Sequence, residues 1–140
     1  MTEKQKRYFN IAKEISFLSD FKRARVGAVV VEKNRIISSG HNSNKTSPLQ
    51  GRYNLKRGID LSYPSKVHAE IAALSPLLNK KNVDWNHVSL YVYREQKDGT
   101  ITCARPCEAC RALIKSLGIK NVFYSDWDGS FVEESYIAGE

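Results

Sequence analysis

The chain has 140 residues, 41% hydrophobic and 26% charged, which excludes a disordered chain and predicts one globular domain, residues 1–140. Its net charge of +7 is concentrated in residues 1–66, which carry 14 Lys and Arg against 5 Asp and Glu, whereas residues 67–140 carry 8 against 10. A basic half indicates either an anionic partner, such as a phosphate group or a nucleic-acid backbone, or simply a solvated basic surface.

The apolar runs and the cysteines indicate where in the cell the protein is expected. Even the most apolar runs, such as VGAVVV, are too short to cross a bilayer, and the N-terminal segment MTEKQKRYF is polar, unlike a secretion signal. Three cysteines cannot form a complete disulfide framework within one chain, and clustered cysteines in a reducing compartment are typically metal ligands or catalytic groups. We therefore expect a cytoplasmic protein with no membrane partner.

The first predicted element is an amphipathic helix over residues 3–18. Thr2 and Gln5 have the spacing of a capping box, which marks its start. Apolar side chains recur at helical spacing along one stripe: Tyr8, Ile11, Ala12, Ile15 and Leu18. Two further runs, VGAVVV and IISSG, flank a polar turn at Lys33 and Asn34, so we expect a β-hairpin there.

A long loop, a helix and a strand are predicted next. Residues 41–66 show no regular periodicity, and a loop of this length inside a domain is usually functional or disordered. A helix beginning near His68 is apolar nearly all round, and Pro76 predicts its end near Leu74. The run VSLYVY then predicts a strand, which REQKDGTIT follows as a short hairpin.

The last predicted elements are a helix and two strands. The segment CEACRALIKSL carries Cys110, Leu113, Ile114 and Leu117 on one face, and Gly118 is a natural stop. NVFYS predicts a strand, and FVEESY is a candidate final strand after the turn DWDGS. The order α-β-β-α-β-α-β-β predicts an α/β fold with helices packed on a central sheet.

Three side chains at the heads of two helices suggest a metal site. Cys107 and Cys110 form a Cys-x-x-Cys pair, whose two thiolates reach one ion from the first turn of a helix, where the helix dipole favours thiolate over thiol. His68 offers a third ligand if the two helices lie side by side. Three protein ligands leave one position open, as in catalytic zinc sites. Glu70 then lies where it can move protons between water and a substrate.

Each of these signals has an ordinary alternative. A single histidine on an apolar helix is more often a core residue, and a single Cys-x-x-Cys also occurs in redox pairs and in four-cysteine zinc modules. The remaining cysteine, Cys103, is expected to be a packed thiol. As a fourth ligand it would close the site and make the zinc structural.

The combination is more specific than its parts. His68-Ala69-Glu70, followed by Pro106-Cys107 and a second cysteine three residues later, resembles the zinc-dependent cytidine and deoxycytidylate deaminase superfamily, whose signature is His-x-Glu and Pro-Cys-x-x-Cys. The VGAVVV strand, Gly40-His41-Asn42 and Tyr63-Pro64 are further similarities, and together they span most of the chain. The resemblance implies Zn²⁺ as the cofactor and hydrolytic deamination at C4 of cytosine or C6 of adenine.

The resemblance also implies a role for each matching residue. The zinc would be held by three side chains: His68, Cys107 and Cys110. Glu70 would be the catalytic residue, passing protons between water, the ring nitrogen and the departing ammonia. Asn42 would contact the sugar or base, and the backbones of Ala69 and Arg105 would grip the base and its amino group. Many relatives carry a small or polar residue in place of Arg105, whose side chain is expected to point toward a phosphate or away from the site.

The implied fold is a three-layer α-β-α sandwich around a mixed five-stranded sheet. Deoxycytidylate and nucleic-acid deaminases usually continue after the fourth strand with a helix and a parallel fifth strand. Only DWDGSFVEESYIAGE follows here, and Asp128-Gly129 favours a hairpin, so we expect an antiparallel fifth strand, with a short helix as the alternative. Relatives commonly assemble, so a homo-oligomer is expected.

A cytosine-containing nucleotide or nucleoside is the first expectation for the substrate, in a deoxycytidylate-like reaction. The loop at residues 41–66 holds basic side chains that suit a phosphate, since Arg binds phosphate bidentately: Lys45, Arg52, Lys56 and Arg57. The chain reads NSNKTSPLQG where deoxycytidylate deaminases typically show a Gly-x-Pro segment, which puts the phosphate assignment in question.

Two other functions stay open at this point. The first is a deaminase acting on cytosine or adenosine in single-stranded DNA, RNA or tRNA, with the basic half as a groove and Tyr8, Tyr53 and Tyr63 as stacking rings. Such an enzyme should lose activity steeply as salt rises. The second is a non-catalytic, zinc-stabilised binding module, which requires Cys103 as a ligand, so that Cys103→Ser would release zinc.

Overall fold

The computed structural model describes residues 1–20, 24–44, 49 and 66–136. The elements in chain order are α1 (Glu3–Ser16), β1 (Ala24–Glu32), β2 (Arg35–His41), α3 (Ala69–Leu74), β3 (Val88–Gln96), α4 (Glu108–Leu117), β4 (Asn121–Ser125) and β5 (Phe131–Ser135). Short 3-10 helices, Ser75–Leu77 and Trp85–His87, lie between α3 and β3. Among the described residues, no helix has the length and apolar character needed to cross a membrane.

The five strands form one mixed sheet in the order β2-β1-β3-β4-β5. β1 is antiparallel to β2 and β3, β3 is parallel to β4, and β4 is antiparallel to β5. The β1–β2 hairpin turns at Lys33 and Asn34, which both have positive φ, 47° and 69°, as a tight two-residue hairpin turn requires. The expected antiparallel fifth strand is confirmed, and Gly129 has a φ of 83° in the turn that leads into it.

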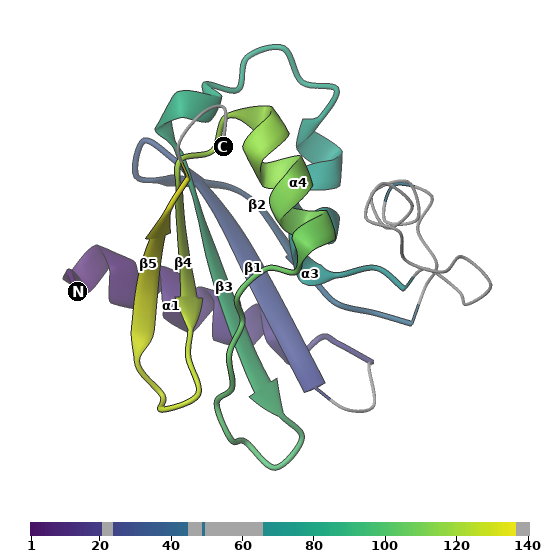
Figure 1. The fold of residues 1–140 in the computed structure, drawn as a ribbon, viewed down its shortest axis with the longest axis vertical. Coiled ribbons are helices and arrows are strands. Elements are labelled where there is room, and N and C mark those ends of the chain that lie inside the picture. The colour runs from purple at the N-terminus through teal and green to yellow at the C-terminus, as the bar shows by residue number, and fades with distance from the viewer. Residues whose placement is uncertain (21–23, 45–48, 50–65, 137–140) are drawn as a thin grey trace.

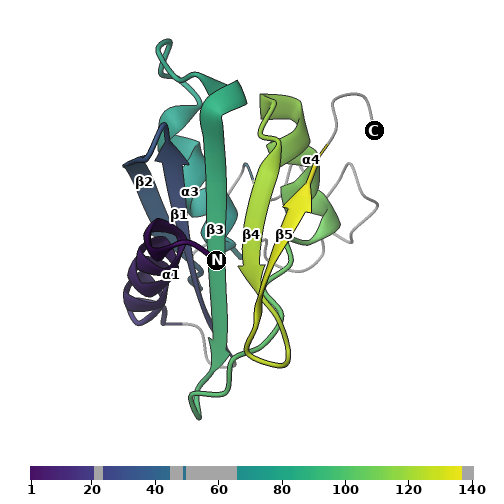
Figure 2. The same ribbon diagram turned by 90° about the vertical axis from the view of Figure 1, so that its left-hand side faces the viewer.

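Helices cover both faces of the sheet, with α1 on one side and α3 and α4 on the other (Figures 1 and 2). Successive strand residues point to opposite faces, which produces two cores. The strand residues beneath α3 and α4 include Ala28, Val30, Leu90, Val92, Val122 and Tyr124. Those beneath α1 are Val29, Val31, Tyr91, Tyr93 and Phe123. The three-layer α-β-α sandwich predicted from the sequence is therefore confirmed.

The N-terminal helix begins as predicted but ends earlier. The capping box is present, because the Gln5 N–H donates to Thr2 Oγ1 at 3.1 Å and the Thr2 N–H donates to Gln5 Oε1 at 3.0 Å. The helix ends at Ser16, so Leu18 lies beyond its last turn and is 65% exposed. Of the predicted stripe, Tyr8 and Ala12 are buried and Ile11 packs against the core, so this part is confirmed. The prediction was wrong for Leu18, and it did not include the buried residues Phe9 and Ser16.

Helix α3 lies unusually close to β2. A Cβ at Gly40 would come 2.5 Å from the Ala73 backbone nitrogen, so only glycine allows this approach. The Ser38 hydroxyl donates to the Ala73 carbonyl at 2.6 Å, which ties the two elements together. The helix ends at Leu74, and Pro76 enters the following 3-10 helix, as predicted. These contacts fix the position of the head of α3, where His68 lies.

The hairpin and helix that follow β3 also match their predictions. The Gln96 N–H donates to the Thr100 carbonyl at 2.8 Å, which closes the hairpin around Gly99. Helix α4 ends at Gly118, whose φ of 91° is the left-handed conformation expected of a glycine stop.

Candidate metal and substrate site

The topology brings the heads of α3 and α4 to the same end of the sheet. Each helix precedes a strand, α3 before β3 and α4 before β4, and runs against it. Because β3 and β4 are parallel, the two helix N-termini meet beyond the carboxyl ends of these strands. His68 is the N-cap of α3, Cys107 is the N-cap of α4, and Cys110 lies in the first turn of α4.

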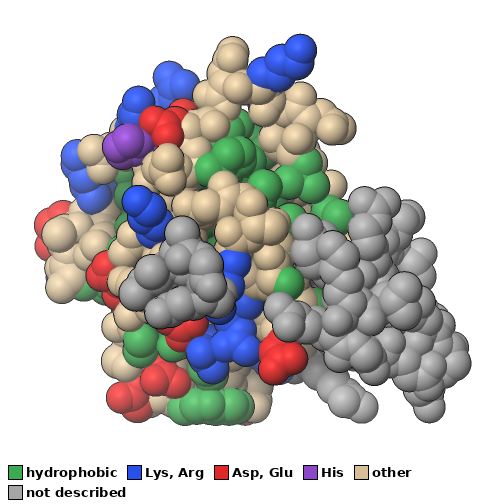
Figure 3. Space-filling model, turned by 45° about the horizontal axis from the view of Figure 1, so that its top comes forward, with side chains coloured by type: hydrophobic (Ala, Val, Ile, Leu, Met, Phe, Trp, Pro, Cys, Tyr) green, Lys and Arg blue, Asp and Glu red, His purple; other side chains and the backbone are tan. Residues whose placement is uncertain are grey.

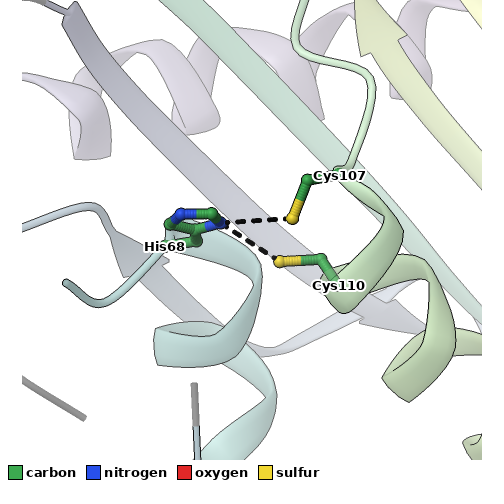
Figure 4. Close-up of side chains that lie close together, drawn as sticks. All are labelled: His68, Cys107 and Cys110. Atoms are coloured by element: carbon green, nitrogen blue, oxygen red, sulfur yellow. Dashed lines mark hydrogen bonds between the residues drawn. The ribbon is translucent and has the colours of Figure 1, made fainter. Parts of the chain in front are cut away.

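The three side chains predicted as metal ligands face one another (Figure 4). His68 Nδ1 lies 3.5 Å from Cys107 Sγ and 3.4 Å from Cys110 Sγ. Zinc bonds of about 2.0–2.1 Å to nitrogen and 2.3 Å to sulfur place these atoms about 3.6 Å apart in a tetrahedral site. The spacing and the donor set therefore fit zinc. Among the described residues, this is the only cluster of three or more potential metal-binding side chains.

Cys103 is not part of the cluster. It is partly buried and packs against the core beneath α3 and α4. The described side chains thus offer three ligands, which is the number of protein ligands in a catalytic zinc site and one fewer than a closed structural site holds.

The two thiols are not equivalent. Cys107 is exposed, and the hydrogen bond from the Cys110 thiol, together with one from His68, lowers the pKa of Cys107 to about 4. The same hydrogen bond, with burial, raises the pKa of Cys110. The hydrogen bond to Cys107 likewise raises the pKa of His68. One thiolate is therefore present well below neutral pH, and a thiolate is the form of cysteine that binds metal.

Glu70 is buried beside these ligands, in the first turn of α3. Burial raises the pKa of its carboxyl group, although the charge of His68 opposes the shift. A carboxyl group whose pKa is raised returns a proton more readily than an ordinary glutamate, which suits a general acid–base residue.

A cavity of about 320 Å³ opens next to the cluster. Its walls come from the start of β1, the end of β2, the segment leading into α3, the end of β3 and the segment before α4. Its volume lies in the range of small-molecule sites. His68, Glu70 and Cys107 line it, and so do three of the predicted substrate residues: Asn42, Ala69 and Arg105. The fourth, Arg52, lies outside the described residues, as do Lys45, Lys56 and Arg57.

Asn42 shapes the wall of this cavity through its side-chain amide. Its Oδ1 accepts from the Val26 N–H at 3.0 Å, and its Nδ2 donates to the Ala24 carbonyl at 3.0 Å. Both partners belong to β1, and both line the cavity. The side chain thus holds the start of β1 and the end of β2 together.

The side chain of Arg105 binds β5. Its Nε donates to Glu134 Oε2 at 2.8 Å, and the Tyr124 hydroxyl donates to the same oxygen at 3.3 Å. The sequence left open whether this side chain points toward a phosphate or away from the site; in the structure Glu134 of β5 engages it. Arg105 lines the cavity together with Ala104 and Cys107.

Two basic residues that line the cavity were not predicted from the sequence. Lys66 lies just before α3, and Arg94 lies near the end of β3. A signal for Arg94 was present, because it is two residues after Val92 and so points to the same face of the strand as that core residue.

Comparison with known proteins agrees with this geometry. The model of the family described as "Cytidine and deoxycytidylate deaminase zinc-binding region" matches residues 2–126. The deoxycytidylate deaminase of Pongo abelii is 31% identical over 106 residues, which are 72% of this chain and 52% of that protein. The deoxycytidylate deaminase of Mycobacterium phage D29 is 31% identical over 129 residues, 84% of this chain and 90% of that protein.

A solved structure shares the fold. The dCMP deaminase of cyanophage S-TIM5, in complex with dCMP and dUMP, superposes with a TM-score of 0.61 at 25% identity, over 92% of this chain and 89% of that chain. The present chain spans about half the length of the Pongo abelii relative, 52%.

Proposed function

The chain belongs to the zinc-binding cytidine and deoxycytidylate deaminase family, and we propose that it hydrolyses the amino group of cytosine in a free nucleotide, giving the uracil product and ammonia. The observation that carries this proposal is the convergence of His68, Cys107 and Cys110 at one cavity with the buried carboxyl group of Glu70. Three ligands and an adjacent acid–base group are the components of hydrolytic zinc sites.

The three ligands would hold zinc beside the cavity, which His68 and Cys107 line, and the other residues have separate tasks. When bound, zinc lowers the pKa of a water molecule from 15.7 to about 7 and so supplies a nucleophile at neutral pH. With zinc held by His68, Cys107 and Cys110, Glu70 would take one proton from the attacking water and deliver it to the ring nitrogen, and would then carry the second proton of that oxygen to the amino group, which leaves as ammonia. Its burial suits this role because a carboxyl group of raised pKa carries the proton between these steps.

The remaining cavity residues orient the substrate. Asn42 uses its amide to fix the wall that β1 and β2 share, and its remaining hydrogen-bonding capacity is available to a sugar or base. Ala69, at the head of α3, and Arg105, just before α4, line the cavity, and we infer that their backbones contact the base. We infer that these groups hold the base with its amino-bearing carbon toward the zinc.

The choice of a cytosine nucleotide is supported by the relatives. The phage D29 relative and the cyanophage S-TIM5 structure are both deoxycytidylate deaminases, and the second was solved with dCMP and dUMP. The cavity is also lined by more basic than acidic side chains, which suits a substrate that carries a phosphate.

A nucleic-acid substrate is the second candidate, favoured by the basic first half of the chain. Of the three tyrosines considered as stacking rings, Tyr8 is buried and donates its hydroxyl to the Asn34 carbonyl at 2.9 Å, so that part of the prediction was wrong. Tyr53 and Tyr63 lie outside the described residues. On the face seen in Figure 3, the described Lys and Arg side chains form separate groups with acidic side chains among them, which is not the continuous groove that a strand requires.

One assay separates these candidates. Mass spectrometry would score deamination of deoxycytidine, dCMP, dCTP, adenosine and a cytosine-containing DNA oligomer at two salt concentrations. Turnover of dCMP supports the proposal. Turnover of the oligomer alone, falling steeply with salt, would replace it with the nucleic-acid function.

Three further predictions concern the domain organisation, the compartment and the oligomeric state of the protein. We propose that residues 1–140 act as a single deaminase domain, in the cytoplasm, where reducing conditions keep the three cysteines free for metal. We also expect a homo-oligomer, which light scattering of the purified protein would detect.

A further inference from the structure

The cavity contains one arginine that no acidic side chain neutralises among the described residues. Arg94 lines the cavity, and the structure gives it no ion pair in the described part of the chain. The third basic residue of the cavity, Arg105, is bound by Glu134 at 2.8 Å. Lys66 donates to the Asn44 carbonyl at 2.9 Å, and no acidic side chain among the residues that the structure describes pairs with it.

The backbone of Arg94 is held rigidly. Its N–H donates to Ser125 Oγ at 3.1 Å, and its carbonyl accepts from the Thr102 N–H at 3.0 Å. In the sheet it is paired with Val26 of β1, so the two side chains lie next to each other on the cavity face. Because the backbone is already fixed, binding a ligand orders only the side chain of Arg94 and not the strand that carries it.

Arg94 is also near the residues expected to touch the substrate. Its strand partner Val26 donates its N–H to the side chain of Asn42 at 3.0 Å, so Arg94 and Asn42 flank the same strand position. Arg94 therefore lines the same cavity as the metal ligands His68 and Cys107, and it is exposed to solvent.

We propose that Arg94, assisted by Lys66, binds the 5′-phosphate of the substrate and thereby sets the preference for a nucleotide over a nucleoside. A guanidinium group matches the geometry of a phosphate and donates two parallel hydrogen bonds to it, and an ammonium group adds a second charge. Of the charged side chains that line the cavity in the described part of the chain, only Glu70 is acidic, and it is buried. This inference rests on the proposed function, since it concerns the same site.

The test is a comparison of dCMP with deoxycytidine in three zinc-loaded proteins: wild type, Arg94→Gln and Arg35→Gln. Arg35 is a matched control, because it is an exposed strand arginine outside the cavity. We expect Arg94→Gln to lower the ratio of kcat/KM for dCMP over deoxycytidine about 10- to 100-fold, the loss typical of a charge-assisted hydrogen bond. Arg94→Lys should recover part of the ratio, and Arg35→Gln should leave it unchanged.

Other results would overturn the inference. Equal losses of kcat/KM on both substrates, at unchanged zinc content, would make Arg94 a structural residue. If the three proteins turned over only the cytosine-containing DNA oligomer of the earlier assay, and Arg94→Gln weakened that turnover, Arg94 would contact a phosphodiester and not the phosphate of a free nucleotide. If wild type deaminates none of these compounds, the proposed function fails, and calorimetry with dCMP and deoxycytidine decides the phosphate contact alone. Weaker binding of dCMP to Arg94→Gln would then uphold that contact, and equal binding would refute it.

Discussion

The substitution Gly40→Ala tests whether the close approach of α3 to β2 builds the site. The added Cβ would lie 2.5 Å from the Ala73 nitrogen, 2.7 Å from the Ala72 carbonyl carbon and 2.8 Å from the Ala72 Cβ. The nearest of these distances is roughly 1 Å short of an ordinary contact of about 3.5 Å. Two of the three atoms are backbone, so α3 must move as a unit, and with it His68 and Glu70.

The displacement of α3 should lower both the free energy of unfolding and kcat. Overpacking of this kind lowers the free energy of unfolding by about 1–3 kcal/mol, which corresponds to a fall in Tm of about 3–10 °C for a chain of this size. Because a misplacement of about 1 Å costs up to about 100-fold in rate, kcat should fall about 10- to 100-fold. Thermal melts, zinc content and deamination of dCMP would be measured on the same preparations.

The control for this experiment is Ser39→Ala, at the adjacent β2 position, which is exposed. Its free energy of unfolding should stay within about 0.5 kcal/mol of wild type. If Gly40→Ala matched Ser39→Ala in both Tm and kcat, the close packing of α3 on β2 would not be what places His68 and Glu70.

Three more predictions concern individual side chains. Cys107→Ser should lose zinc while Cys103→Ser keeps it, and inductively coupled plasma mass spectrometry would measure the zinc content of both proteins. Loss of zinc from Cys103→Ser would instead indicate a closed structural site. In metal-free protein, Cys107 should react with iodoacetamide at pH 5–6, because its lowered pKa of about 4 keeps the thiolate until the pH falls through that value, and reaction only near pH 9 would contradict this. Asn42→Ala should lower the free energy of unfolding in urea by about 1–3 kcal/mol, since it leaves the Val26 N–H and the Ala24 carbonyl unpaired. An unchanged urea midpoint would show that these bonds contribute nothing.

The parts of the site that lie in short local motifs could be predicted from the sequence. His68 and Glu70 are one residue apart at the head of a helix, and Cys107 and Cys110 span one helical turn, so each pair is placed by its own helix. Only the meeting of the two helices depends on the topology, and parallel β3 and β4 produce it. The direction of β5 was likewise local, because the turn at Gly129 selects a hairpin.

The parts that depend on distant pairing were missed or left undecided. The side chain of Arg105 is engaged by Glu134, which lies 29 residues further along the chain. The alternation along β3 indicates which face Arg94 lies on, but Arg94 reaches the cavity because β3 pairs with β1 in the register that places it opposite Val26, and no local pattern specifies that register. The error at Leu18 has a different cause, since helical periodicity continued in the sequence beyond the point where α1 ends.

The most direct test of the account is a comparison of zinc-loaded wild type with Glu70→Gln, using mass spectrometry to follow conversion of dCMP to dUMP. The substitution preserves the size of the side chain and leaves all three zinc ligands in place, so both proteins should bind equal amounts of zinc. The account predicts that wild type forms dUMP and that Glu70→Gln is slower by about 100- to 10,000-fold, the usual contribution of a general acid–base group. Equal rates of dUMP formation in the two proteins, or no dUMP from wild type, would contradict it.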